Sequence, residues 1–322
     1  MDRFQCIIPV ILEDYGRMKD KYHLLFRFLP IKELIFIGPE SLGSQIEKDK
    51  NACFKGLNVS YINENTIISY EVFKAAYFSL LKTINKKMDA PRVGWFLQQF
   101  LKMAFSYICE DEYYLSWDAD TIPVRHVDLL DSNGIPYFDI KDEYTENYFK
   151  TINNLFGVGK VIKGSFISEH MLFKKSYMLE MIKSIEELPI EGAIFYEKIL
   201  SAIDRDNLIA GFSEFETYGT WVALNYTSEY KIRRWKSFRN LNVFISVDEL
   251  TEDDIEWLGL DFDAVSFEKT QMTSKVLTAL IRDPVSRGLG PELFYETVLK
   301  EGLLGKYEDG SILAENGRYY PI

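Results

Sequence analysis

The sequence is poor in cysteine and has no long uninterrupted apolar run. Its three cysteines, Cys6, Cys53 and Cys109, are far apart and odd in number, so they form neither a disulfide framework nor the spacing of a zinc site. No window approaches the ~20 uncharged apolar residues of a membrane span, and the N-terminal segment lacks the apolar region of a signal peptide. We therefore expect a cytoplasmic protein, either soluble or peripheral at the inner face of the cytoplasmic membrane.

Positive charge is also scarce. The chain has 37 lysines and arginines against 49 aspartates and glutamates, for a net charge of -12. Nucleic-acid affinity comes from clustered basic side chains, so no nucleic-acid partner is expected. One basic cluster runs from Lys231 through Arg234 to Arg239. Its ordinary role is a solvated surface, and its alternative role is to bind a diphosphate or an anionic acceptor.

Two phosphate-binding motifs are missing. No G-x-G-x-x-G follows the first expected strand and no G-x-x-x-x-G-K-[ST] occurs anywhere, which disfavours dinucleotide dehydrogenases and P-loop NTPases. The chain of 322 residues is 47% hydrophobic and 15% aromatic, which is ample for a large core. Its start reads as strand 4–10, helix 15–29 and strand 34–37. This pattern predicts an α/β fold with a mixed, mostly parallel sheet flanked by helices.

The most informative stretch is an apolar run over 113–117 that ends in Asp118, Ala119 and Asp120. Side chains two residues apart share a face in extended backbone, so both carboxylates can converge on one cation. The carboxyl edge of an open α/β sheet is where ligands bind. Hard cations such as Mn²⁺ and Mg²⁺ prefer carboxylate and phosphate oxygens. The stretch therefore predicts a divalent-metal site for a phosphate-bearing ligand.

A helix expected over 93–104 leads into this strand. Opposite its apolar stripe, Trp95, Gln98, Gln99 and Lys102 fall together at positions i, i+3, i+4 and i+7. A tryptophan with two amides favours a hydrogen-bonding wall beside a ligand. The alternative is a half-buried helix packed under a loop.

A second group of acids lies in 211–221. Ser213 and Glu216 fit an S-x-x-E capping box, which gives Glu216 a structural role at the helix start. Glu214 shares a helix face with Tyr218 and Trp221, and an acid beside aromatic rings is a candidate general base. We therefore predict Glu214 as the base and Glu216 as the second candidate.

Glu169 and His170 interrupt another apolar run. A histidine there is either a structural side chain or a residue near an acceptor or a metal. We place both residues at the candidate site.

Taken with the helix before it and 213–219 after it, the Trp117–Asp120 motif resembles that of bacterial GT-A-type glycosyltransferases of the surface-polysaccharide kind. The resemblance covers about 1–270, with 271–322 expected as a helical C-terminal appendage. It implies that Asp118 and Asp120 hold Mn²⁺ or Mg²⁺ against the diphosphate of a nucleotide sugar, most often a UDP sugar. The acceptor is then a saccharide or a lipid-linked saccharide, and we expect an inverting transfer. The residues expected to contact donor or acceptor are Trp95, Gln98, Gln99, Lys102, Trp117, Asp118, Glu169, His170, Tyr218 and Arg234.

The resemblance has one departure. Many such enzymes take a further metal ligand from a histidine near the C-terminus, and this chain has no histidine after His170. Either His170 supplies that ligand, or water and phosphate oxygens complete the shell.

Two other functions stay open at this stage. The D-x-D-x-T pattern also occurs in haloacid-dehalogenase-type phosphatases, with Asp118 as nucleophile and Asp120 as acid. That class needs the motif near the start of the core and a later G-D-x-x-x-D, and neither is found. A non-catalytic carbohydrate-binding protein is the second alternative.

Overall fold

The computed structural model describes residues 3–83, 92–204 and 210–302 and the segments 304–306, 311–314 and 319–321. The chain divides into two compact units. The first unit comprises Met1–Leu12, Ile31–Asp118 and Leu129–Arg234, and the second comprises Glu13–Pro30, Ala119–Asp128 and Trp235–Ile322. The boundary predicted at residue 270 does not coincide with this division, because each unit is assembled from segments far apart in the sequence.

A five-stranded sheet forms the centre of the first unit, in the order β3-β2-β1-β4-β7. Its strands are β1 (Phe4–Pro9), β2 (Ile31–Gly38), β3 (Val59–Asn63), β4 (Tyr113–Trp117) and β7 (His170–Lys174). The first four pair in parallel, and β7 runs antiparallel to β4. The predicted mixed, mostly parallel sheet is therefore confirmed. β1 is buried at five of its six positions, as expected for a strand covered on both faces.

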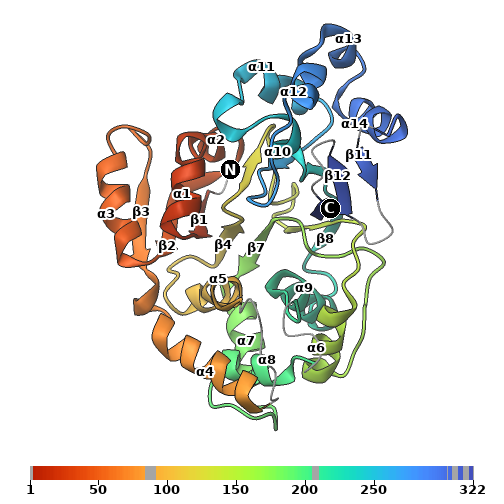
Figure 1. The fold of residues 1–322 in the computed structure, drawn as a ribbon. Helices are drawn as coiled ribbons and strands as arrows, with labels where there is room; N and C mark the ends of the chain where they lie inside the picture. Colours follow the sequence, from red (N-terminus) through yellow and green to blue (C-terminus); the bar gives the residue numbers. More distant parts are fainter. Residues whose placement is uncertain are drawn as a thin grey trace. The chain divides into compact units, whose positions relative to one another are not determined.

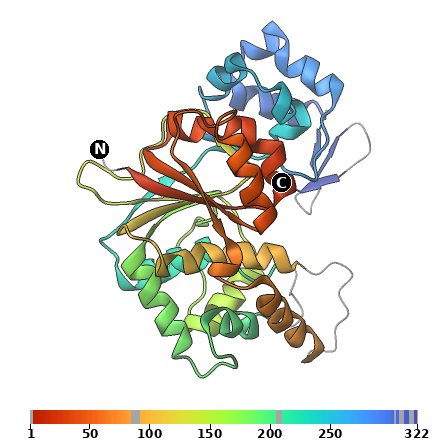
Figure 2. The ribbon, with the colours of Figure 1, turned by 90° about the vertical axis from the view of Figure 1, so that its left-hand side faces the viewer.

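Helices pack against this sheet within the first unit. They are α3 (Glu40–Asp49), α4 (Tyr70–Thr83), α5 (Val93–Ala104), α6 (Glu146–Phe156), α7 (Lys175–Glu186), α8 (Phe195–Ala202) and α9 (Glu214–Asn225). Figure 1 shows α4 to α9 gathered on one side of the sheet, and Figure 2 shows the same grouping after a quarter turn. The apolar stripe of α5 lies in the core, where the Phe100 ring contacts Phe73, Phe195 and Phe212. A separate pair of parallel strands, β6 (Tyr137–Ile140) and β8 (Lys231–Arg234), completes the unit.

The second unit has its own small sheets. β5 (Thr121–Pro123), β10 (Ala264–Ser266) and β9 (Ser237–Phe238) form one, and β11 (Leu304–Lys306), β12 (Ser311–Ala314) and β13 (Tyr319–Pro321) form the other. Its helices are α1 (Leu12–Met18), α2 (His23–Phe28), α10 (Leu241–Phe244), α11 (Glu252–Leu258), α12 (Lys275–Arg282), α13 (Pro284–Arg287) and α14 (Pro291–Lys300). Helix α1 begins at Leu12, the last residue of the first segment of the first unit.

The C-terminal region differs from the predicted helical appendage. Helices α12 to α14 are present, but three short strands follow them. The Thr278 hydroxyl on α12 also donates to the Phe244 carbonyl at the end of α10, at 2.5 Å. This region is therefore part of a unit that begins well before residue 270. None of the helices in the described ranges is long and apolar enough to cross a bilayer.

Candidate active site

Asp118 follows directly after β4, at a position that the topology marks for ligand binding. The chain adds β2 and β3 on one side of β1 and then crosses to place β4 on the other side, so the strand order reverses between β1 and β4. Open α/β sheets bind ligands outside the carboxyl ends of the strands at such a reversal. The Asp118 side chain is 35% exposed, and one of its oxygens accepts a hydrogen bond from Lys102.

Lys102 links two carboxylates at the centre of the site. Its Nζ lies 2.7 Å from Asp118 Oδ1 and 2.6 Å from Glu214 Oε1. Burial by itself would lower the pKa of Lys102, but the two carboxylates outweigh burial and hold that pKa above its ordinary value. Lys102 is therefore a charged ammonium. From its position on α5 it holds Asp118, which follows β4, and Glu214, which begins α9.

Two features keep this ammonium in place. The Tyr114 hydroxyl donates to the Lys102 carbonyl at 2.9 Å, and Lys102 Nζ lies 4.3 Å from the centre of the Phe215 ring. Gln99, one turn earlier on α5, accepts from the Glu214 backbone N–H at 3.2 Å and donates to the Trp95 carbonyl. Gln99 and Lys102 thus hold α5 and α9 together next to Asp118, at the end of β4.

The wall predicted on α5 divides into two parts. Gln99 and Lys102 are buried and hydrogen-bonded to protein groups, as a packed helix requires. Trp95 and Gln98 are only half-buried, and their predicted contact with donor or acceptor stays a prediction.

Glu214 is not the free carboxylate that the base assignment assumed. It is buried and paired with Lys102. Burial raises the pKa of Glu214, and the Lys102 ammonium opposes that rise. The aromatic residues on the same helix face as Glu214 are core residues, since Tyr218 and Trp221 are both buried. Tyr218 further accepts a hydrogen bond from the Lys174 backbone N–H through its hydroxyl.

Glu216 has a structural role, but with different partners from those predicted. The Ser213 hydroxyl accepts from the Glu216 backbone N–H at 3.3 Å, which caps α9. The Glu216 carboxylate, however, accepts from the Ser165 hydroxyl at 2.6 Å and from the Phe166 backbone N–H at 2.9 Å. It therefore fastens the segment before β7 to α9, and burial raises its pKa.

Glu169 adopts a backbone conformation that is unusual for a residue with a side chain. Its φ is 62°, and it is the one such non-glycine residue in the described chain. Strained residues of this kind persist where surrounding contacts hold them, and they cluster at functional sites. The Glu169 carbonyl accepts from the Asp118 backbone N–H at 2.8 Å, and Lys141 Nζ lies 2.6 Å from its carboxylate. The strained residue therefore fixes the backbone of the candidate metal ligand.

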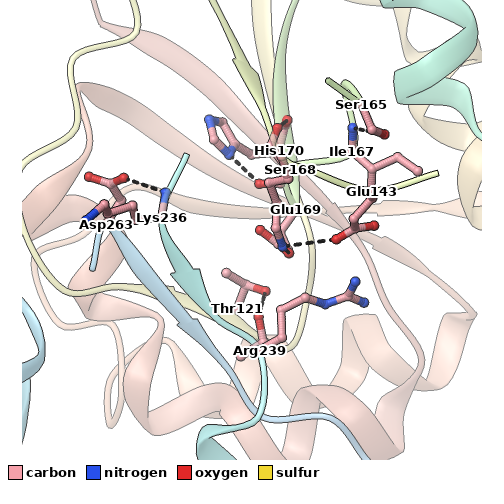
Figure 3. A network of polar contacts seen from close by, with 12 residues as sticks. Thr121, Glu143, Ser165, Ile167, Ser168, Glu169, His170, Lys236, Arg239 and Asp263 are labelled. Carbon is pink, nitrogen blue, oxygen red and sulfur yellow. Dashed lines mark hydrogen bonds and ion pairs between the residues drawn. The ribbon is translucent and has the colours of Figure 1, made fainter. Parts of the chain in front are cut away.

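His170 is held by protein groups at both ring nitrogens, and its role as a metal ligand stays a prediction. Its Nδ1 lies 2.8 Å from the Ser168 carbonyl (Figure 3). Its Nε2 lies 3.0 Å from Asp139 Oδ2, so both ring nitrogens are engaged. The ring packs against Trp117, with 4.9 Å between ring centres. Trp117 itself is fully buried, so it cannot contact a donor or acceptor as predicted.

The first part of the predicted basic cluster, Lys231 to Arg234, pairs with acids of the first unit. Arg234 pairs with Asp142 at 2.7 Å, and Lys231 pairs with Asp131. Arg233 donates to both oxygens of buried Asp139, at 2.6 and 2.7 Å. Burial by itself would raise the pKa of Asp139, but Arg233 and His170 outweigh it and hold that pKa below its ordinary value. Arg234 is exposed, and its predicted contact with a donor or acceptor stays a prediction.

Asp120 belongs to the second unit. There its backbone carbonyl accepts from the Phe267 N–H at 2.8 Å, and Oδ1 accepts from the Thr121 hydroxyl at 3.4 Å. Across the described ranges, no group of three or more His, Cys, Asp or Glu side chains is placed to hold a metal ion. Two carboxylates two residues apart fit Mg²⁺ or Mn²⁺, which complete their shells with water and phosphate oxygens.

A family model described as a family of unknown function (DUF6492) matches residues 39–271. The chain belongs to this family. No curated protein matches the sequence.

Solved structures with some likeness are glycosyltransferases by their titles. Mouse xyloside xylosyltransferase 1 is 12% identical, with 85% of this chain and 100% of that chain covered and a TM-score of 0.42. The galactosyltransferase LgtC with donor and acceptor sugar analogues is 10% identical, with 93% and 99% covered and a TM-score of 0.40. GlyE of Streptococcus pneumoniae TIGR4 is 11% identical, with 100% and 65% covered and a TM-score of 0.36. TM-scores below 0.5 and identities near these values assign no activity to this family member.

Sequence reasoning missed three polar residues of the site. Lys141, Glu143 and Asp139 come together with the Glu169–His170 segment, because Lys141 Nζ also lies 3.3 Å from Glu143. The available signal was the charged run that ends at Glu143, which is typical of a solvated loop. Only the folded chain places these charges next to β7.

Proposed function

We propose that the protein is a glycosyltransferase that uses a nucleotide-sugar donor and a divalent cation. The observation that carries the proposal is the placement of Asp118 at the carboxyl end of β4, at the reversal of strand order, with Asp120 two residues later. The half-exposed Asp118 carboxylate is oriented by Lys102 and its backbone by Glu169. The proposed donor is a UDP sugar and the proposed acceptor a saccharide or a lipid-linked saccharide, as the motif resemblance implies.

The metal proposed is Mn²⁺ or Mg²⁺, held by Asp118 and Asp120. When bound, such a cation neutralises charge that develops on a leaving diphosphate. The protein's own contribution is to place the Asp118 carboxylate. Lys102 does this through the ion pair, with its Nζ 2.7 Å from Asp118 Oδ1.

We assign Glu214 to positioning Lys102. A buried carboxylate paired at 2.6 Å cannot take the proton of an acceptor hydroxyl without breaking the ion pair, which is costly in a buried site. The inverting outcome depended on Glu214 as a base, so it is dropped from the proposal. The anomeric configuration of the product, followed by proton NMR during transfer, decides the outcome directly.

The phosphatase alternative does not fit the topology. A haloacid-dehalogenase-type nucleophile is expected near the start of the core, whereas Asp118 follows the fourth strand of the chain. No observation favours it over transfer. A carbohydrate-binding protein without catalysis is separated from a transferase only by turnover.

Release of UDP from a panel of UDP sugars, with and without Mn²⁺, tests the proposal. We expect UDP release that needs Mn²⁺ and a thermal shift with UDP and Mn²⁺ together, because a ligand at about 100 times its Kd stabilises the native state by about 2.7 kcal/mol. Asp120→Asn should lose both effects and still fold. Asp248→Asn is the matched control, since Asp248 is an exposed aspartate of the same unit.

Three results would contradict the proposal. One is unchanged, Mn²⁺-dependent turnover by Asp120→Asn. Another is hydrolysis of simple phosphomonoesters in place of UDP sugars, which indicates the phosphatase. The third is sugar binding without turnover of any donor, which indicates a binding protein.

A further inference from the structure

Tyr144 is the most exposed aromatic side chain of the described residues, at 64%. It lies just before α6. The ring is nevertheless not free to swing, because it stacks on Phe149 with the planes 11° apart and the centres 5.2 Å apart. Phe149 is itself buried on α6. Tyr144 therefore presents a flat aromatic surface in a fixed orientation.

Charged groups lie beside this ring. Lys160 Nζ is 5.2 Å from the centres of both stacked rings, and it donates to the Glu143 carbonyl at 3.1 Å. The Glu143 side chain is partly exposed. The result is a rigid aromatic face with an ammonium next to it, while the neighbouring Glu143 carboxylate lies 3.3 Å from Lys141 Nζ.

This combination matches the chemistry of a sugar ring. A pyranose has one apolar face made of C–H groups, which packs on an aromatic ring, and hydroxyls around its edge that exchange hydrogen bonds with charged side chains. Scattered exposed aromatics are ordinary on protein surfaces. An aromatic ring fixed in advance with charged partners differs, because little side-chain freedom is lost when a ligand binds.

The Tyr144 surface is connected to Asp118 by contacts within the first unit. Lys141 Nζ lies 3.3 Å from the Glu143 carboxylate and 2.6 Å from the Glu169 carboxylate. Figure 3 shows Glu143 and Glu169 in this network. Glu169 in turn accepts from the Asp118 backbone N–H. Charged groups thus run continuously from the exposed ring to the candidate metal ligand.

We propose that Tyr144, with Glu143 and Lys160, forms a subsite for a saccharide, and that this saccharide is the acceptor or the part of it next to the transferred sugar. The role of this saccharide as acceptor rests on the proposed function. The binding of a sugar at Tyr144 does not depend on that function. The subsite recognises a pyranose with an unsubstituted apolar face, and Glu143 and Lys160 select among its hydroxyls.

Saturation-transfer NMR with methyl glycosides as probes tests the subsite on the whole protein. The panel comprises the methyl β-glucoside, β-galactoside, β-N-acetylglucosaminide and α-mannoside, each at millimolar concentration. We expect at least one to receive saturation at its ring protons. Tyr144→Ala should lower the affinity for that glycoside by about three- to tenfold, the range expected for one aromatic contact. Tyr144→Phe should bind it like the wild type.

The matched control is Tyr107→Ala. Tyr107 is a tyrosine of the same unit with a similar exposure, 54%, and its removal should leave the binding unchanged. Equal binding by Tyr144→Ala and the wild type would overturn the inference, as would equal weakening by both alanine variants or the absence of binding by every probe.

A separate measurement distinguishes this inference from the proposed function. UDP with Mn²⁺ is added to wild type and to Tyr144→Ala, and the thermal shift is recorded. The absence of a thermal shift in the wild type contradicts nucleotide-sugar transfer but does not contradict a sugar site at Tyr144. An intact shift in both proteins, with glycoside binding weakened only in Tyr144→Ala, supports both proposals.

Discussion

Replacing Lys102 with methionine removes the ammonium of the site while keeping most of the side-chain volume. The Lys102 and Glu214 side chains are 5% and 4% exposed, whereas Asp118 is about one-third exposed and partly screened by water. Breaking a buried ion pair by removing one partner costs about 3–5 kcal/mol, and a water-screened pair adds on the order of 0–1 kcal/mol. We therefore expect the free energy of unfolding of Lys102→Met to fall by about 3–5 kcal/mol near pH 8.

Urea unfolding followed by tryptophan fluorescence measures this change. The deficit should depend on pH, because burial raises the pKa of Glu214 and in the variant no ammonium opposes that rise. The unpaired, ionised Glu214 is what destabilises the fold. Lowering the pH through the raised pKa protonates it, so the deficit should shrink as the solution becomes more acidic.

A second substitution isolates the pair. Exchanging both Lys102 and Glu214 for apolar residues of similar volume leaves no uncompensated buried charge, so the double variant should recover much of the lost stability. Lys183→Met is the control, since Lys183 is 76% exposed and 3.9 Å from its partner. It should change stability by less than about 0.5 kcal/mol. A Lys102→Met deficit no larger than that of Lys183→Met, or one that is the same at every pH, would refute the reasoning.

Three further outcomes follow from the first unit. Glu169→Gly and Glu169→Ala lose the same ion pair, but only glycine relieves the positive φ, so the glycine variant should be about 1 kcal/mol more stable in urea unfolding. Asp139→Asn should cost about 1.5–3 kcal/mol at neutral pH. That cost should shrink as pH falls below the ordinary value of 3.8 toward the depressed pKa of Asp139, because the wild type then loses its stabilising charge. Gly219→Ala places a Cβ 2.4 Å from Phe166 and should lower thermal stability by about 1–3 kcal/mol. Gly94→Ala, with nothing within 4 Å, should be neutral or stabilising.

Local sequence patterns predicted individual helices and strands well where the pattern lies within the element itself. The apolar run before Asp118 is β4, and the stripe of 93–104 is the buried face of α5. The cap at Ser213 starts α9 as predicted. These features depend on side-chain period and on hydrogen bonds within a few residues, which the sequence displays directly.

The side-chain partners could not be predicted in the same way. Lys102 reaches Glu214 across 112 positions and Lys141 reaches Glu169 across 28. Nothing in either neighbourhood of the sequence marks these pairs. The sequence therefore predicted the buried Glu214 as a catalytic base and the buried Tyr218 as a contact of donor or acceptor.

By itself, the sequence determined that an apolar strand ends in two carboxylates and that the surrounding fold is α/β, because both follow from short-range periodicity. Only the tertiary structure decided what each acid does. It placed the Lys102 ammonium between Asp118 and Glu214 and gave both ring nitrogens of His170 a partner. It also left Tyr144 exposed while its ring stacks on the buried Phe149. These roles depend on which distant segments meet and on how much water reaches them, and neither quantity is contained in the local pattern of residues.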